Sequence, residues 1–148
     1  MLTMNNKPLF LVVDDDQDDR DLLGMAYNEG TYNCDLVFAE SGQQALDILD
    51  KSAVQPSLLL LDINMPGMNG LELLQKLKVS ERYRVMPIVI LTTSSNSKTI
   101  DAAYHMGANS YLIKPDNFNK LSKVWDSLYH FWTSTAKLPI SSTSFIAS

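Results

Sequence analysis

Aspartates that follow apolar runs are the residues of this chain best suited to chemistry. Asp14 and Asp15 come directly after the run Leu9 to Val13, and Asp62 comes after four leucines, Leu58 to Leu61. Carboxylates crowded at one site repel one another and need a cation. All-oxygen ligation by a few protein groups suits Mg²⁺, which keeps several waters and accepts phosphate oxygens alongside. The three aspartates therefore predict a magnesium site if the fold brings them together.

A carboxylate on a divalent ion can also act as a nucleophile towards phosphorus and form an aspartyl phosphate. Asp62 is the candidate for this role. The transferring group carries spread negative charge, which the Lys114 ammonium would stabilise and to which the Thr92 hydroxyl could donate. Taken singly, an aspartate after a strand commonly caps the next helix, and a lone lysine or threonine commonly faces solvent or packs against its neighbours. Their joint occurrence is what favours phosphoryl chemistry.

These residues must be positioned by the elements around them, and the chain alternates short apolar runs with stretches of helical spacing. The predicted strands are Leu9 to Val13, Cys34 to Ala39, Leu58 to Leu61, Ile88 to Leu91 and Ser110 to Ile113. The predicted helices run from Asp18 to about Glu29, from Ser41-Gly42 onwards, from Leu71 to about Val79, up to Met106, and from about Phe118 to Trp132. In the first of these helices, Leu22, Leu23, Met25 and Ala26 suggest an apolar face. Five strands alternating with five helices predict an α/β fold, with a parallel sheet covered by helices on both faces.

We expect a doubly wound, flavodoxin-like sheet with the strand order 2-1-3-4-5. This order places the first and third strands side by side at the switch point, so Asp14, Asp15 and Asp62 would meet at the carboxyl edge. Thr92 and Lys114 follow the fourth and fifth strands and belong to the same edge.

Length and composition limit the class of protein. A chain of 148 residues has the usual length of a single domain. Its net charge of -5 argues against nucleic acid as a partner, because binding to the phosphate backbone relies on positive charge. No apolar run approaches the roughly 20 residues of a membrane-spanning helix, and Met1 to Pro8 does not resemble a secretory signal. We therefore expect a cytoplasmic protein without membrane insertion. The lone Cys34 excludes an internal disulfide and is expected in the core.

From Leu9 to about Phe131 the chain resembles the receiver domain of two-component response regulators. The matching motifs are Leu11-Val12-Val13-Asp14-Asp15-Asp16, Leu61 to Gly70, Ile90-Leu91-Thr92-Thr93, Gly107-Ala108 and Tyr111-Leu112-Ile113-Lys114-Pro115. The resemblance implies that Asp62 accepts a phosphoryl group from a sensor histidine kinase or a phosphotransfer protein. It also implies that Mg²⁺ is held by Asp14, Asp15 and Asp62 and by the backbone carbonyl of Asn64.

The same resemblance implies a conformational switch. Thr92 and Lys114 would hold the phosphoryl oxygens, Thr92 would move towards that group, and Tyr111 would turn inward. By its residue type alone, Tyr111 is an ordinary half-buried strand aromatic. The domain would then be a phosphoacceptor switch that catalyses only its own phosphorylation and dephosphorylation, and not an enzyme acting on a free substrate.

Within the family, the chain is similar to stand-alone receivers of the cyanobacterial phytochrome-partner type. The signs are the acidic opening Asp14 to Asp19, the run Thr92-Thr93-Ser94, and Phe131-Trp132 followed by Leu138-Pro139. This similarity implies a homodimer formed through the last helix and the neighbouring surface. Residues 1–132 would be the receiver domain, and 133–148 an extended or disordered C-terminal extension without a separate output domain.

Two alternatives remain open from the residues. Asp14-x-Asp16 after an apolar strand also resembles haloacid-dehalogenase-like phosphatases, in which Asp14 would attack phosphorus and Asp16 would be the general acid. The second alternative is a pseudo-receiver that binds partners without being phosphorylated. Labelling with acetyl phosphate would separate these alternatives from phosphorylation at Asp62.

Overall fold

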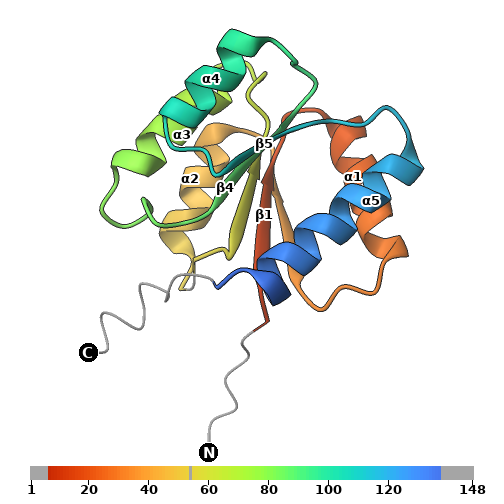
Figure 1. Cartoon of the computed structure of the whole chain (residues 1–148). Coiled ribbons are helices and arrows are strands. Elements are labelled where there is room, and N and C mark those ends of the chain that lie inside the picture. The colour runs from red at the N-terminus through yellow and green to blue at the C-terminus, as the bar shows by residue number, and fades with distance from the viewer. Residues whose placement is uncertain (1–6, 54, 138–148) are drawn as a thin grey trace, which may run out of the picture.

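The computed structural model describes residues 7–53 and 55–137, which contain one parallel sheet between two layers of helices (Figure 1). The strand order is β2-β1-β3-β4-β5, as predicted, and every neighbouring pair is parallel. The strands are β1 (Leu9–Val13), β2 (Asp35–Ala39), β3 (Leu58–Leu61), β4 (Ile88–Thr92) and β5 (Ser110–Ile113). The predicted second strand began one residue too early, because Cys34 precedes β2 and is buried there as a core residue.

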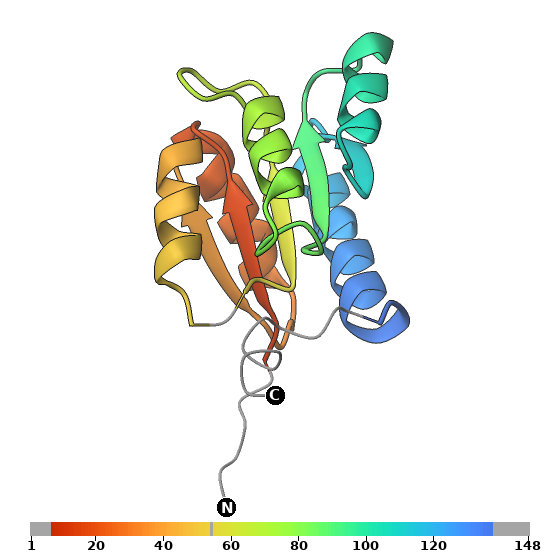
Figure 2. The ribbon, with the colours of Figure 1, turned by 90° about the vertical axis from the view of Figure 1, so that its left-hand side faces the viewer.

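The helices divide between the two faces of the sheet. They are α1 (Gln17–Glu29), α2 (Gly42–Lys51), α3 (Gly70–Val79), α4 (Ser97–His105), α5 (Phe118–His130) and a short π-helix, η1 (Phe131–Thr135). Helices α1 and α5 cover one face, and α2, α3 and α4 lie on the other (Figure 1, Figure 2). Among the described residues, no helix is both long and apolar enough to cross a membrane.

The end of the last helix differs from the expectation. Regular α-helix stops at His130, and the chain continues helically through Thr135, so residues 133–135 are not extended. The Thr133 hydroxyl donates to the carbonyl of Tyr129 at 2.5 Å, a side-chain hydrogen bond that supports the helical course there. The rest of the predicted extension, residues 138–148, lies outside the described residues.

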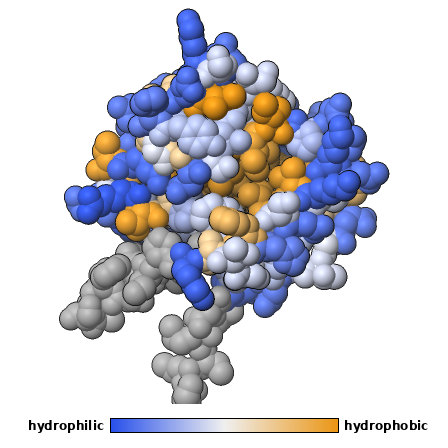
Figure 3. Space-filling view, in the orientation of Figure 1, coloured by the Kyte–Doolittle hydropathy of each residue, from blue (hydrophilic) through white to orange (hydrophobic). Residues whose placement is uncertain are grey.

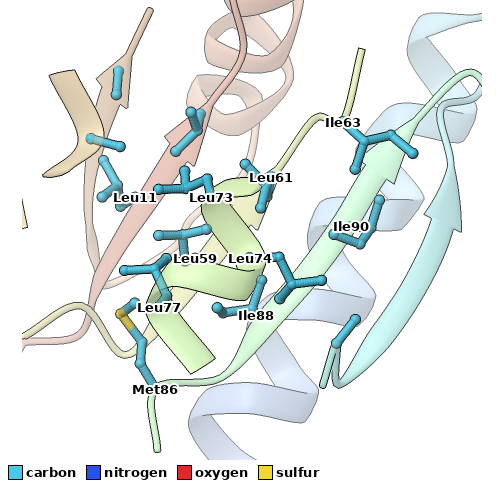
Figure 4. Packing of buried hydrophobic residues seen from close by; sticks show 14 of the residues in the cluster. Leu11, Leu59, Leu61, Ile63, Leu73, Leu74, Leu77, Met86, Ile88 and Ile90 are labelled. Atoms are coloured by element: carbon cyan, nitrogen blue, oxygen red, sulfur yellow. The ribbon is translucent and has the colours of Figure 1, made fainter. Parts of the chain in front are cut away.

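The central strand β3 is buried on both sides, which explains its four consecutive leucines. Side chains alternate across a strand, so Leu59 and Leu61 join the core beneath α2 and α3, while Leu58 and Leu60 join the core beneath α1 and α5. Figure 4 shows Leu59 and Leu61 packed with leucines of α3. The strand that carries Asp62 at its end is therefore fixed by two separate cores.

The register of the sheet brings the strand ends to one level. Val13 is paired with Leu61, and the Asp62 N–H donates to the Val13 carbonyl at 2.9 Å. On the other side, the Lys114 N–H donates to the Thr92 carbonyl at 2.7 Å. The residues that follow β1, β3 and β5 therefore leave the sheet at the same edge.

One expectation for the first helix was wrong in part. Leu22 and Met25, predicted on its apolar face with Leu23 and Ala26, have exposed fractions of 42% and 59%. Only Leu23 and Ala26 of the four are buried, because α1 contacts the sheet and α5 along a narrow stripe. Leu22 and Met25 are three positions apart and share a neighbouring, solvent-facing side of the helix.

Gly70, the first residue of α3, lies directly against the backbone that follows β3. Its N–H donates to the Ile63 carbonyl at 3.1 Å, and a Cβ atom at this position would overlap the backbone of Asp62 and Ile63. The close approach of α3 to the end of β3 therefore requires glycine at this position.

We expect Gly70→Ala to lower the free energy of unfolding by about 1–3 kcal/mol, because backbone must move to admit the methyl group. The matched control is Gly24→Ala in α1, where the nearest atoms, on the Phe38 ring, lie 3.8 Å from the new Cβ. That change should raise stability by up to about 1 kcal/mol. Urea unfolding followed by circular dichroism measures both, and an unchanged Gly70→Ala protein would contradict the proposed contact.

Candidate functional site

The structure brings together the three carboxylates that the sequence placed at one edge. Carboxylate oxygens of Asp14, Asp15 and Asp62 all lie within 4.8 Å of one another. Asp14 and Asp62 are buried, whereas Asp15 is exposed. A solvated ion can therefore approach from the side of Asp15, while the other two carboxylates form the floor of the site.

Asp14 is held rigidly on both sides. Its Oδ1 accepts the Asp16 N–H at 2.9 Å, its Oδ2 accepts from Lys114 at 2.6 Å, and its backbone carbonyl accepts from Arg20 Nη1 at 2.8 Å. Burial raises the pKa of the Asp14 carboxyl above its ordinary value, and the hydrogen bond from Lys114 opposes that rise. The ionised form of Asp14 thus depends on the nearby cation.

Lys114 supplies that cation. Its Nζ lies 2.6 Å from Asp14, 2.8 Å from Asp19 and 3.2 Å from Asp62, and only 10% of its side chain is exposed. Burial alone would lower the pKa of Lys114, but its hydrogen bonds to Asp14 and Asp19 and the charge of Asp62 raise it above the ordinary value. Lys114 therefore stays charged at neutral pH.

Thr92 is completely buried at the end of β4 and is linked to Asp62 through Asn64. The Asn64 side chain donates to the Thr92 hydroxyl oxygen at 3.3 Å, and the Asn64 N–H donates to Asp62 Oδ1 at 3.1 Å. A single residue, Asn64, thus connects the Thr92 hydroxyl to the carboxylate of Asp62 by hydrogen bonds.

Tyr111 in β5 is tied to the loop that follows Thr92. Its hydroxyl donates to the Ser94 carbonyl at 2.8 Å, and its N–H donates to the hydroxyl oxygen of Tyr104 at 3.1 Å. The ring is half-buried, as its residue type suggested, but its polar end has a defined partner. A movement of the β4–α4 loop would therefore change the position of Tyr111.

Sequence reasoning missed two residues of this site, Asp19 and Arg20. Both project from the first turns of α1, which begins after the N-cap Asp16. The only signal was the density of aspartates between Asp14 and Asp21. Nothing local could pair Asp19 with Lys114, because 95 positions separate them in the chain.

The donor set fits a hard divalent cation. Asp14, Asp15 and Asp62 offer oxygen atoms only, the ligands that Mg²⁺ and Mn²⁺ take from proteins. The acidic cluster can therefore bind a divalent metal, and the charge of such an ion would offset the repulsion among the three carboxylates.

Comparison with known proteins identifies relatives over most of the chain. The sequence profile of the response regulator receiver domain matches residues 10–126. Response regulator Rcp1 of Synechocystis sp. is 31% identical over 140 residues, which cover 91% of this chain and 95% of Rcp1. The chemotaxis protein CheY homolog of Campylobacter jejuni is 36% identical over 105 residues, which cover 71% of this chain and 79% of that protein.

The solved structures to which this chain is similar are also response regulators. The phosphorylated cyanobacterial phytochrome response regulator RcpA has a TM-score of 0.83 and 30% identity, covering 90% of this chain and 99% of RcpA. The Mn²⁺-bound form of Rcp1 has a TM-score of 0.80 and 30% identity, with the same coverage of the two chains. Response regulator RPA3017, from red light signaling of R. palustris, has a TM-score of 0.83 and 34% identity, again with this coverage.

Removing the cation of the site should destabilise the fold. We expect Lys114→Met to lower the free energy of unfolding by about 3 kcal/mol in metal-free buffer, because the buried Asp14 and Asp62 lose their counter-charge. The control Lys120→Met, which removes an exposed ion pair to Asp116, should cost at most about 0.5 kcal/mol. Equal losses in the two variants would contradict the structural role of Lys114.

The pH dependence of that loss follows from the raised pKa of Lys114. A cation with a raised pKa stabilises the folded state fully below its unfolded pKa, here 10.5, and this contribution disappears as pH rises through the folded pKa. The difference between wild type and Lys114→Met should therefore be the same at about pH 7 and about pH 9, measured by urea unfolding.

Proposed function

The chain belongs to the response regulator receiver family, and from this premise we propose that Asp62 is the residue that accepts the phosphoryl group. Receiver domains take phosphoryl groups from histidine kinases or phosphotransfer proteins, so the protein acts as a response regulator in two-component signalling. The observation that carries the proposal is the position of Asp62. Its carboxylate lies at the end of a buried strand, beside two further carboxylates and in contact with Lys114.

In the proposed transfer, a carboxylate oxygen of Asp62 forms a bond to phosphorus while the bond from phosphorus to the donor's imidazole nitrogen breaks. That nitrogen keeps the electron pair. Lys114, already 3.2 Å from Asp62, and the Thr92 hydroxyl would hold the phosphoryl oxygens. In hydrolysis, a water oxygen attacks phosphorus, and the Asp62 carboxylate and inorganic phosphate are released. The protein thus catalyses only its own phosphorylation and dephosphorylation.

Mg²⁺ is the metal in this proposal, held by Asp14, Asp15, Asp62 and the backbone carbonyl of Asn64. The all-oxygen donor set supports it, as does the Mn²⁺-bound form of the similar protein Rcp1. When bound, the ion supplies positive charge that offsets the charge of the carboxylates and of the transferring group. The protein's own part is to fix the carboxylates, which it does through the register of β1 and β3.

The switch in this proposal consists of Thr92 and Tyr111. A new phosphoryl group would draw Thr92 away from Asn64, to which it is hydrogen-bonded at 3.3 Å. Ser94, two residues further on, accepts the hydroxyl of Tyr111, so the movement would reach β5. A local charge would in this way shift a packed aromatic side chain.

A homodimer through α5 and its neighbours is also part of the proposal. A hollow between β5, α5 and η1 has apolar walls formed by Leu112, Val124, Leu128, Phe131 and Trp132. Figure 3 shows hydrophobic side chains gathered between α4 and α5. Proteins commonly bury such surface in interfaces. We propose residues 1–132 as the receiver domain, 133–148 as its C-terminal extension, and the cytoplasm as the place where the protein acts.

The two alternative functions are not favoured. No relative described above is a phosphatase, and the residue Asp14 is only 1% exposed, with Oδ1 and Oδ2 both accepting hydrogen bonds. Asp14 is therefore poorly placed to attack phosphorus. A pseudo-receiver would not need an acidic cluster with a buried lysine, and this chain has both.

Incubation with radiolabelled acetyl phosphate and Mg²⁺ tests the phosphoacceptor. We expect label on Asp62 in the wild-type protein, located by peptide mass spectrometry, and no label in Asp62→Asn. The control Asp101→Asn changes an exposed aspartate of α4 and should label as the wild type does. Label retained in Asp62→Asn, or found on Asp14, would refute the proposal, and an unlabelled wild type would favour the pseudo-receiver.

Metal affinity tests the proposed ligands. Asp15→Asn should weaken Mn²⁺ binding by at least about tenfold, because it removes a direct carboxylate ligand. Asp18→Asn removes the same charge from the exposed first turn of α1 and should change the affinity little. Electron paramagnetic resonance of free Mn²⁺, with Mg²⁺ as competitor, gives both affinities. Similar losses in the two variants would indicate a diffuse charge effect without a defined site.

A further inference from the structure

The three donors of the Lys114 ammonium are matched by three carboxylates. A lysine ammonium carries three N–H groups, and Lys114 Nζ lies within 3.2 Å of oxygens of Asp14, Asp19 and Asp62. Every donor thus has an acceptor while Asp62 is unmodified. Any further acceptor that enters the site must displace one of the three.

The three partners differ in how easily they can be displaced. Asp14 is buried, and its other oxygen is fixed by the Asp16 N–H. Asp62 is the residue that would carry the phosphoryl group. The side chain of Asp19 is 43% exposed, so water can replace Lys114 as its partner. Its backbone N–H is held by the N-cap Asp16 whatever its side chain does. Asp19 is therefore the partner that can be released.

A phosphoryl group on Asp62 adds strong acceptor oxygens close to Lys114. We propose that Asp19 competes with this group for Lys114 and thereby weakens the hold of the site on the phosphoryl group. Asp19 is in this sense a positioning residue, since it acts through Lys114. The inference rests on the proposed function of Asp62 and adds a residue that sets how readily the site is phosphorylated.

Whether the loss of Asp19 strengthens or weakens binding of a phosphoryl group distinguishes this role from a structural one. If Asp19 only oriented Lys114 correctly, removing it would weaken binding of a phosphoryl group. If Asp19 competes, removing it frees one donor and strengthens binding. The contact is a partly exposed ion pair, so the change should be about two- to fivefold.

The test measures the affinity of the full-length protein for beryllofluoride, a phosphoryl mimic, by fluorine NMR with saturating Mg²⁺. Asp19→Asn should bind it about two- to fivefold more tightly than wild type, and label faster with acetyl phosphate. Asp18→Asn is the matched control, because Asp18 is also an acidic residue in the first turn of α1 and its loss changes net charge and helix-dipole interaction equally. Asp19→Glu, which keeps a carboxylate near Lys114, should stay close to wild type.

The outcomes are distinct. Tighter binding in Asp19→Asn alone supports the competition. Unchanged or weaker binding in Asp19→Asn overturns it, as does an equal gain in Asp18→Asn, which would show a general charge effect. Failure of the proposed function appears differently, as a wild-type protein that neither binds beryllofluoride nor labels at Asp62, and the inference would then fall with it.

Discussion

The structure depends on a charge imbalance held at the edge of a hydrophobic sheet. Two buried carboxylates and a third on α1 contact one ammonium group, and Asp15 adds a fourth carboxylate beside the two buried ones. Coulomb interactions at such short distances are strong where water is largely excluded, so neither sign of charge is tolerable there without the other. The negative excess that remains gives the site its attraction for a divalent cation.

The fold prevents the carboxylates from moving apart. Carboxylates on loops would move apart into water, but Asp14 and Asp62 directly follow paired strands whose residues are buried on both faces. The close approach of Gly70 leaves the backbone after Asp62 little room to shift. Two hydrophobic cores, one on each side of β3, thus provide the stability needed to hold like charges together.

Much of this arrangement was predictable because it follows from the backbone. Apolar runs identify the strands, right-handed crossovers restrict the strand order, and a parallel sheet brings the residues after β1, β3, β4 and β5 to one edge. The meeting of Asp14, Asp15, Asp62 and Lys114 was therefore foreseen. The roles proposed for Asp62, Asn64, Thr92 and Tyr111 are chemical, and labelling and metal binding are needed to test them.

What could not be predicted depends on how helices are rotated and where they end. The Asp19 side chain reaches Lys114 only because α1 packs with Leu23 and Ala26 inward, and the same rotation exposes Leu22 and Met25. Hydrophobic spacing alone allowed all four apolar residues on one face. At the other end of the chain, helical spacing does not distinguish an α-helix from the π-helix that follows His130.

The packing of Trp125 gives the molecule an internal optical reporter. Its indole N–H in α5 donates to the Leu23 carbonyl in α1 at 3.0 Å, and its ring stacks on Phe10 of β1 while only 1% exposed. Trp132, in η1, is partly open to solvent. The fluorescence of Trp125 therefore reports how α1 packs against α5. A water-soluble quencher reduces mainly the fluorescence of the partly exposed Trp132, which distinguishes the two signals.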